Sequence, residues 1–113
     1  MAETLQYHYT DEAGYKAIVA QPTWRFVASL PPGGNPFGAY FTDLPPDFPR
    51  LFKLGIPKSK REYVFAFVDG GDLTPLPGGR GDYISYSRTD YNVEVERQRY
   101  SGRVDQWKSA DMT

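Results

Sequence analysis

Three short segments of the sequence carry side chains whose types and order could serve one chemistry. His8 lies in Tyr-His-Tyr-Thr, Tyr40 follows a loop rich in glycine and proline, and Asp82 follows a second such loop. A histidine ring N–H can donate to a sugar hydroxyl, and a tyrosine face attracts a planar cationic ring. A carboxylate can hold a ribose hydroxyl and stabilise the oxocarbenium-like centre of a breaking glycosidic bond. The three segments therefore indicate a site that binds a nucleotide and cleaves it.

Each of these residues also has an ordinary structural interpretation, and the sequence leaves both interpretations open. A lone histidine is often a partly buried ring bonded to the backbone, and Tyr40 could be a core aromatic residue. Asp82 could be a turn residue, because aspartate is common in turns. Arg80-Gly81-Asp82 also matches the tripeptide of integrin-type adhesion sites, which often arises by chance. Placement in one cleft would favour the catalytic interpretation.

The composition narrows the classes of protein and of site. The 113 residues predict one domain, 1–113, with a core over about 5–100 and a polar tail over 101–113. The absence of cysteine excludes a disulfide framework and a cysteine nucleophile, and one histidine disfavours a zinc site. No apolar run reaches the roughly 20 residues that span a bilayer, and the N-terminus lacks a secretory signal. We therefore expect a soluble protein with no membrane partner.

Apolar patterns predict short strands joined by turns and loops. They are expected over 5–9, 24–30, 38–42, 63–68, 82–87 and 92–100. The segment 63–68 is the most apolar in the chain and is the best candidate for a central strand. Two loops rich in glycine and proline, 31–36 and 69–81, lead into the segments of Tyr40 and Asp82. Loops this long in a small domain are often functional, which supports a site at these strand ends.

Helices are expected in two places. The first would begin at the N-cap Thr10 and end near Ala20. Its residues expected to face inward are Ala13, Ala17 and Ile18. The second would span 47–54 and be stopped by Gly55. Several short strands with one or two short helices predict the α+β class.

The three segments together resemble motifs of the ADP-ribosyltransferase superfamily. Residues 7–10 (Tyr-His-Tyr-Thr) are similar to its first-strand motif, and residues 38–43 (Gly-Ala-Tyr-Phe-Thr-Asp) to its second. Residues 81–86 (Gly-Asp-Tyr-Ile-Ser-Tyr) look like its third, in which an acid begins a strand. Polymerase-like members usually carry glutamate there, whereas Asp82 completes a His-Tyr-Asp set. Over residues 5–100 the chain therefore resembles the His-Tyr-Asp type of ADP-ribosyltransferase toxins.

The resemblance implies a small split β-sheet fold in which two short sheets flank a cleft for NAD. His8 would contact the adenosine-side ribose, the backbone of Tyr9 would hold the nicotinamide amide, and Tyr40 would stack on nicotinamide. Asp82 would orient the nicotinamide ribose and support charge as the glycosidic bond breaks. Further ligand contacts are expected from Thr10, Gly38, Arg88 and Phe52, with Phe48 as the alternative second stacking aromatic.

The implied function is transfer of ADP-ribose from NAD to an acceptor, with release of nicotinamide. The first hypothesis is a mono-ADP-ribosyltransferase toxin domain that uses NAD as a substrate, needs no metal and presents its acceptor through the loop 70–81. Such a domain is expected to be secreted or delivered, to act in a target-cell cytoplasm, and to have an immunity protein as partner. The alternatives are NAD hydrolysis at the same site, a non-catalytic module that binds a nucleotide or ADP-ribose, and adhesion through residues 80–82.

Overall fold

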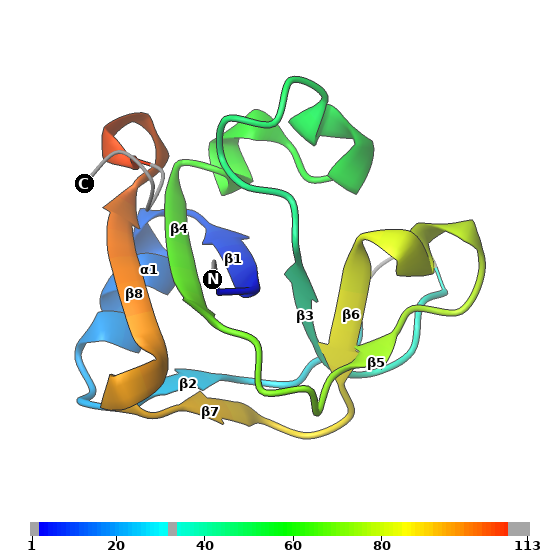
Figure 1. Cartoon of the computed structure of the whole chain (residues 1–113), viewed down its shortest axis with the longest axis horizontal. Helices are drawn as coiled ribbons and strands as arrows, with labels where there is room; N and C mark the ends of the chain where they lie inside the picture. The colour runs from blue at the N-terminus through cyan, green and yellow to red at the C-terminus, as the bar shows by residue number, and fades with distance from the viewer. Residues whose placement is uncertain (1–2, 32–33, 109–113) are drawn as a thin grey trace.

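The fold is built from antiparallel strands and one α-helix, α1 (Glu12–Val19), across the residues that the computed structural model describes, 3–31 and 34–108 (Figure 1). The strands are β1 (Leu5–Thr10), β2 (Trp24–Phe26), β3 (Ala39–Thr42), β4 (Tyr63–Val68), β5 (Thr74–Pro75), β6 (Ile84–Ser87), β7 (Tyr91–Val93) and β8 (Gln98–Arg103). Short 3₁₀ turns lie at Leu51–Leu54, Lys58–Lys60, Gly79–Asp82, Val95–Arg97 and Val104–Gln106. The predicted α+β class is confirmed.

The larger sheet has the order β5-β6-β3-β1-β4-β8, and its two halves are joined weakly. Strand β1 pairs along its whole length with β4, and β3 pairs along its whole length with β6. Between β1 and β3 the paired residues are Tyr7 and Thr42 alone. Figure 1 shows β1 beside β4 and β3 beside β6, as two parts of the sheet. The prediction of a central strand over 63–68 is confirmed, because β4 lies between β1 and β8.

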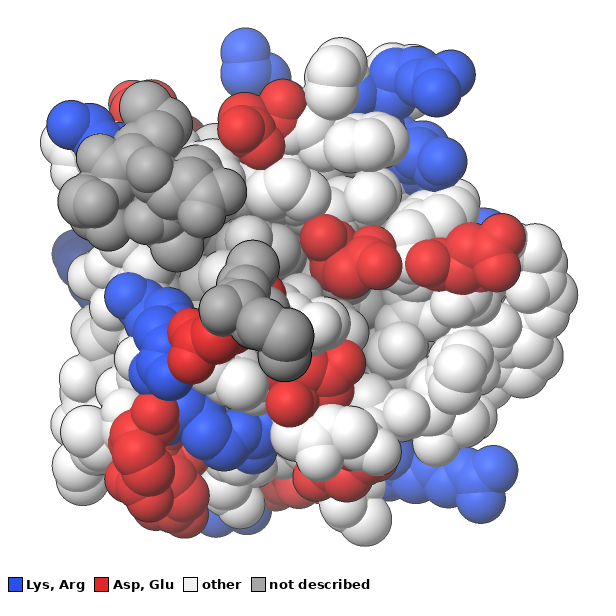
Figure 2. Space-filling view, viewed as in Figure 1, with Lys and Arg blue, Asp and Glu red and all other residues white. Residues whose placement is uncertain are grey.

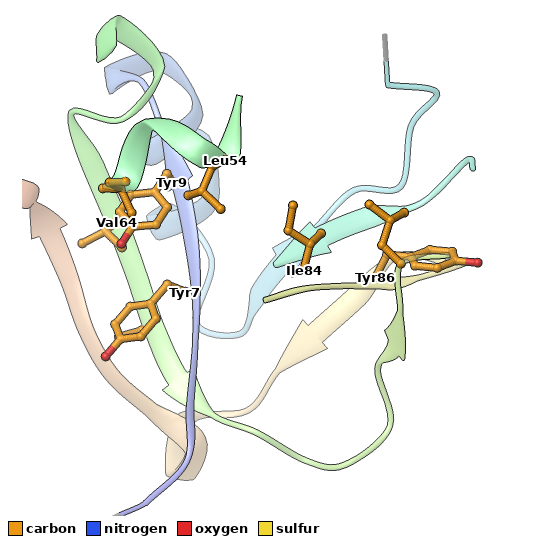
Figure 3. Close-up of a cluster of buried hydrophobic side chains, with 9 residues drawn as sticks. Tyr7, Tyr9, Leu54, Val64, Ile84 and Tyr86 are labelled. Carbon is orange, nitrogen blue, oxygen red and sulfur yellow. The ribbon is translucent and has the colours of Figure 1, made fainter. Parts of the chain in front are cut away.

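Two clusters of buried side chains lie on opposite faces of this sheet, because successive residues of a strand point to opposite faces. The first, which we call the aromatic core, packs between the larger sheet and the β2–β7 pair. It consists of Trp24, Phe26, Ala39, Phe41, Phe65, Phe67, Tyr91 and Val93. The second, which we call the cavity-side cluster, is drawn in Figure 3. It consists of Tyr7, Tyr9, Leu51, Leu54, Val64, Ala66, Leu76, Ile84 and Tyr86.

The helix α1 corrects two predictions about its start and its inward face. Its N-cap is Asp11 rather than Thr10, because the Asp11 carboxylate accepts a hydrogen bond from the Gly14 N–H at 2.9 Å. Ala13 and Ala17 are exposed, whereas Ile18 packs against the aromatic core as predicted. The inward face is set by a larger side chain, Tyr15, whose ring stacks on Tyr63 with centroids 4.6 Å apart.

The predicted strand over 24–30 ends early, at Phe26. Beyond it the Ala28 N–H donates to the Asp90 carboxylate at 2.8 Å, so a side chain takes the donor that a strand partner would need. Ser29 then forms an isolated bridge with Gly38, at the start of the segment that becomes β3. Of the loop predicted over 31–36, residues 32–33 lie outside the described residues.

The predicted strand over 92–100 is two strands in different sheets. Strand β7 pairs with β2, whereas β8 pairs with β4, so the chain changes sheets between them. The change is made by the 3₁₀ turn Val95–Arg97, where Val95 is 62% exposed. Residues 101–103, predicted as tail, belong to β8, and residues 109–113 lie outside the described residues.

The predicted helix over 47–54 is reduced to the 3₁₀ turn Leu51–Leu54. Pro49 explains the loss, because proline has no N–H and disfavours the helical conformation of the residue before it, here Phe48. Gly55 ends the turn as predicted, with a φ of 76°. The shortened segment still supplies Leu51 and Leu54 to the cavity-side cluster.

Candidate functional site

A cavity of about 480 Å³ lies where β1 and β3 separate. Its wall comprises Tyr7, His8, Tyr9, Pro31, Asn35, Tyr40, Phe41, Thr42, Leu54, Gly55, Ile56, Leu76, Arg80 and Ile84. Figure 3 shows Tyr9 and Leu54 on one side of this space and Ile84 across from them. Of the predicted site residues, His8, Tyr9 and Tyr40 therefore meet at one cavity.

The backbone of β1 shows why Tyr9 is suited to contact a ligand. The Thr4 carbonyl accepts a hydrogen bond from the Asp69 N–H at 2.9 Å, so Thr4 directs its backbone toward β4. Alternate residues of a strand point their N–H and C=O to opposite sides, which turns those of Tyr7 and Tyr9 toward β3. Tyr7 finds its partner in Thr42, but the pairing ends there. The N–H and C=O of Tyr9 therefore lie at the edge of the cavity.

His8 occupies the place where the ladder between β1 and β3 would continue. Its Nδ1 lies 3.0 Å from the carbonyl oxygen of Tyr40. In the register set by the Tyr7–Thr42 pair, Tyr40 is the residue that would face Tyr9. The His8 ring thus takes the acceptor that the Tyr9 N–H would otherwise use, and the sheet stays open at this point.

The hydrogen bond of His8 also fixes which ring nitrogen carries the proton. A carbonyl oxygen only accepts, so Nδ1 must be the donor, and Nε2 of the neutral ring is then an acceptor. The ring packs against Phe26 and Phe41, with centroids 4.8 and 5.7 Å away. This burial lowers the pKa of His8, and the hydrogen bond to Tyr40 opposes it. The ring N–H that was expected to donate to a ligand is therefore used by the Tyr40 carbonyl, which leaves Nε2 as an acceptor.

Tyr40 lines the cavity with a ring that is held in place. Its ring stacks on its cross-strand partner Tyr86, with centroids 5.4 Å apart and planes 15° from parallel. Its hydroxyl donates to the carbonyl of Pro36. Burial raises the pKa of Tyr40, so the hydroxyl is neutral at pH 7. The ring is therefore a preformed surface and needs little ordering to receive a ligand.

Asp82 lies beside the cavity without lining it. It is the last residue of the 3₁₀ turn Gly79–Asp82, it is exposed, and β6 begins at Ile84 rather than at Asp82. Arg80 and Ile84, two residues before and two residues after it, do line the cavity. The next residue, Tyr83, is anchored because its carbonyl accepts a hydrogen bond from Thr42 Oγ1 at 2.6 Å. Asp82 thus lies in the turn before β6, between two residues of the cavity wall in the sequence.

Gly38 and Thr10, predicted as ligand contacts, are used in packing. A Cβ on Gly38 would lie 2.5 Å from the Ser87 carbonyl oxygen and 2.9 Å from the Tyr86 ring. The glycine is therefore needed for close approach of β3 and β6. The Thr10 hydroxyl packs in the same way against Gly14, where a Cβ would lie only 2.0 Å from it. Neither residue is part of the cavity wall.

The remaining predicted contacts also lie away from this cavity. Phe52 is 68% exposed, and with Phe48 it lines a second cavity of about 350 Å³. Arg88 is exposed and belongs to neither cavity. The cavity wall contains two aromatic residues that the sequence did not offer as ligand contacts, Tyr7 and Phe41. Phe41 was missed because its alternation on β3 places its ring in the aromatic core, where it is buried.

The charges of the cavity wall differ from those of the outer surface. Acidic and basic side chains are interspersed over the face seen in Figure 2. The cavity wall has one charged residue, Arg80, which the sequence presented only as part of a possible adhesion tripeptide. Its guanidinium donates to the Leu54 carbonyl at 2.6 Å. An adhesion tripeptide presents its arginine to a receptor, so this attachment disfavours the adhesion alternative.

Metal-binding clusters and membrane-spanning helices are both absent from residues 3–31 and 34–108. That part of the chain contains no group of three or more His, Cys, Asp and Glu side chains that could hold a metal ion. It likewise contains no helix long and apolar enough to cross a membrane.

Comparison of the chain with models of known families, with curated proteins and with solved structures finds no match.

Proposed function

We propose that the chain is a mono-ADP-ribosyltransferase domain, which transfers ADP-ribose from NAD to an acceptor and releases nicotinamide. The observation that carries the proposal is the opening of the sheet beside His8, which turns the N–H and C=O of Tyr9 toward the cavity. A primary carboxamide carries a donor and an acceptor side by side, and one residue of an unpaired strand edge complements both. Nicotinamide carries such a carboxamide.

The neighbouring groups suit the rest of the nicotinamide riboside. The nicotinamide ring of NAD is planar and cationic, and an aromatic face attracts such a ring by about 1–2 kcal/mol when water is excluded. Tyr40 would be this face, since Tyr86 and Pro36 already hold its ring. The Nε2 of His8 would accept a hydrogen bond from a ribose hydroxyl, the adenosine-side ribose in the family resemblance.

Asp82 would act on the bond that breaks. The bond between nicotinamide and the ribose carbon breaks with its electron pair on the ring nitrogen, so nicotinamide leaves as a neutral molecule. Positive charge then develops on the ribose, and a carboxylate beside it stabilises that charge and orients the hydroxyls. The acceptor atom forms its bond to the same carbon and loses its proton to solvent. In this scheme Asp82 is the catalytic residue.

The split-sheet arrangement of an ADP-ribosyltransferase fold is part of the same proposal. It is supported by two halves of a sheet that share one residue pair, Tyr7 with Thr42, and have the cavity between them. A toxin role, delivery into a target cell, an immunity partner and the identity of the acceptor stay predictions from the sequence resemblance.

The test is a measurement of nicotinamide released from NAD, with and without candidate acceptors. We expect release by the unmodified chain and a loss of about 100-fold or more in Asp82→Asn, because the variant removes charge stabilisation from the reacting centre. Asp105→Asn is the matched control, since Asp105 is an exposed carboxylate paired with Arg103 and lies outside the cavity. It should release nicotinamide at the unmodified rate.

The outcomes separate the candidate functions. Release that needs an acceptor supports transfer, and release into water alone supports NAD hydrolysis at the same site. If a folded sample binds NAD but releases no nicotinamide with any acceptor, the proposal fails and a non-catalytic binding module replaces it. Equal loss in Asp82→Asn and Asp105→Asn would contradict the assignment of Asp82.

A further inference from the structure

Arg80 gives the cavity an unusual charge distribution. The other residues of its wall are aliphatic, aromatic or neutral polar side chains. The tyrosine hydroxyls are neutral, because burial raises the pKa of Tyr7 to about 12 and that of Tyr9 further. The His8 ring is neutral for the same reason, since burial lowers its pKa. At pH 7 the described cavity wall therefore carries one charge, and it is positive.

Arg80 is also held in position by the backbone of another segment. One of its terminal nitrogens donates to the Leu54 carbonyl, which joins the turn Gly79–Asp82 to the turn Leu51–Leu54. Gly55 leaves room for this nitrogen, because a Cβ there would lie 3.3 Å from it. A guanidinium has five N–H groups, so most of its donors are not used by this bond.

The charge of Arg80 has no ion-pair partner among the described residues. The ion pairs found in residues 3–31 and 34–108 join Lys16 to Glu12, Arg25 to Asp90, Lys60 to Asp11, Arg99 to Glu3 and Arg103 to Asp105. A partly buried charge without a counter-ion is costly unless something else compensates it. A positioned, partly buried cation with unused donors in an otherwise neutral cavity is suited to an anionic ligand group.

We propose that Arg80 is the anion subsite of this cavity and that it binds the diphosphate of a nucleotide ligand. A planar guanidinium matches the spacing of phosphate oxygens and binds them through paired N–H donors. The proposal rests on the proposed function for the identity of the ligand, because NAD joins its two ribosides through a diphosphate. The anion subsite itself requires only a nucleoside diphosphate.

The experiment compares the binding of ADP and of adenosine, which share a base and a ribose and differ in the diphosphate. The unmodified chain should bind ADP at least about 10-fold more tightly than adenosine in low salt, and added salt should reduce the ratio. Arg80→Gln should bring the ratio close to one and leave the affinity for adenosine unchanged. Arg50→Gln is the matched control, since Arg50 is exposed and outside the cavity.

A second variant separates recognition from a structural contribution. Arg80→Lys keeps the positive charge but loses the planar fork, so it should keep part of the preference for ADP. The preference is a ratio of two affinities in the same protein, so a general loss of folded protein would not change it. If Arg80→Gln does not fold, the ratio of the affinities for ADP and adenosine in Arg80→Lys still tests the proposal. A ratio equal to that of the unmodified chain would overturn binding of the diphosphate by the planar guanidinium.

The proposal is overturned if the unmodified chain does not prefer ADP or if Arg80→Gln keeps the full preference. Its failure is distinguishable from that of the proposed function. Nicotinamide release with an unchanged preference in Arg80→Gln would refute the anion subsite alone. A preference lost in Arg80→Gln, in a chain that releases no nicotinamide, would refute transfer and leave the anion subsite supported.

Discussion

The two faces of the larger sheet are built from different aromatic residues. The aromatic core is rich in phenylalanine, and Phe26, Phe65 and Phe67 are almost completely buried there. The cavity-side cluster carries tyrosine instead, and its wall is open to a cavity of about 480 Å³. Phenylalanine has no group that needs a hydrogen bond, whereas tyrosine adds a polar hydroxyl to a large apolar ring. The difference separates a face that stabilises the fold from the open face on which we propose that the ligand binds.

His8 connects the two faces. Its ring packs on Phe26 and Phe41 of the aromatic core, yet its hydrogen bond to Tyr40 lies where the sheet opens. The aromatic core therefore positions the ring that prevents Tyr9 from pairing with β3. A change in the core should alter stability first, whereas a change in the cavity wall should alter ligand binding first.

The largest expected effect is loss of stability on truncating the aromatic core. Phe65→Ala removes a side chain with no exposed surface, whose ring contacts Trp24, Phe26 and Tyr15. We expect the free energy of unfolding to fall by about 3–5 kcal/mol, from lost burial and the cavity left behind. Urea denaturation followed by tryptophan fluorescence measures it. A loss below about 1 kcal/mol would contradict the assignment of the stabilising face, since surface changes cost as little.

The sequence predicted the strands whose formation depends on a local apolar pattern. An uninterrupted apolar run predicted the central strand β4, and the apolar pattern over 38–42 predicted β3. The change of sheet at Val95–Arg97 was missed, because it depends on β7 and β8 having partners distant in sequence. The loss of the helix over 47–54 was foreseeable from Pro49 alone.

The candidate site was predictable to a similar extent. The order of the motifs indicated one shared site, and His8, Tyr9 and Tyr40 do line one cavity. Arg80 and Leu54 were missed, because they meet through the docking of two turns that have no shared local signal. The tautomer of His8 was also unpredictable, since it follows from a bond to a carbonyl 32 residues away.

An effect of intermediate size is expected on the free energy of unfolding when His8 is protonated. Its folded pKa lies below the unfolded value of about 6.5, so the unfolded state binds more protons between the two values. Stability from neutral His8 is therefore complete above about pH 6.5 and is lost as the pH falls toward the folded pKa. The slope has an upper limit of about 1.4 kcal/mol per pH unit. Denaturation between pH 7.5 and about 5.5 measures it.

The matched variants for this slope are His8→Asn and Asp43→Asn. Asparagine keeps a donor for the Tyr40 carbonyl but does not titrate, so the slope should disappear in His8→Asn. Burial raises the pKa of Asp43, so its carboxyl contributes a slope of the opposite sign and Asp43→Asn should not remove the effect. Because the chain has one histidine, a slope that persists in His8→Asn would show that His8 does not link the core to the site.

The smallest expected effect concerns Phe52, which the sequence offered as the second aromatic for nicotinamide. Its ring is 68% exposed and lies outside the cavity wall, whereas Tyr40 belongs to that wall. Phe52→Ala should change the free energy of unfolding by less than about 0.5 kcal/mol, as exposed substitutions do, and should leave the KM for NAD unchanged. Tyr40→Leu, which removes the aromatic face but keeps an apolar side chain, should raise that KM. Nicotinamide release at varied NAD concentrations measures both. A raised KM in Phe52→Ala with no change in Tyr40→Leu would place the ligand against the exposed ring and contradict the open, tyrosine-rich face as the binding face.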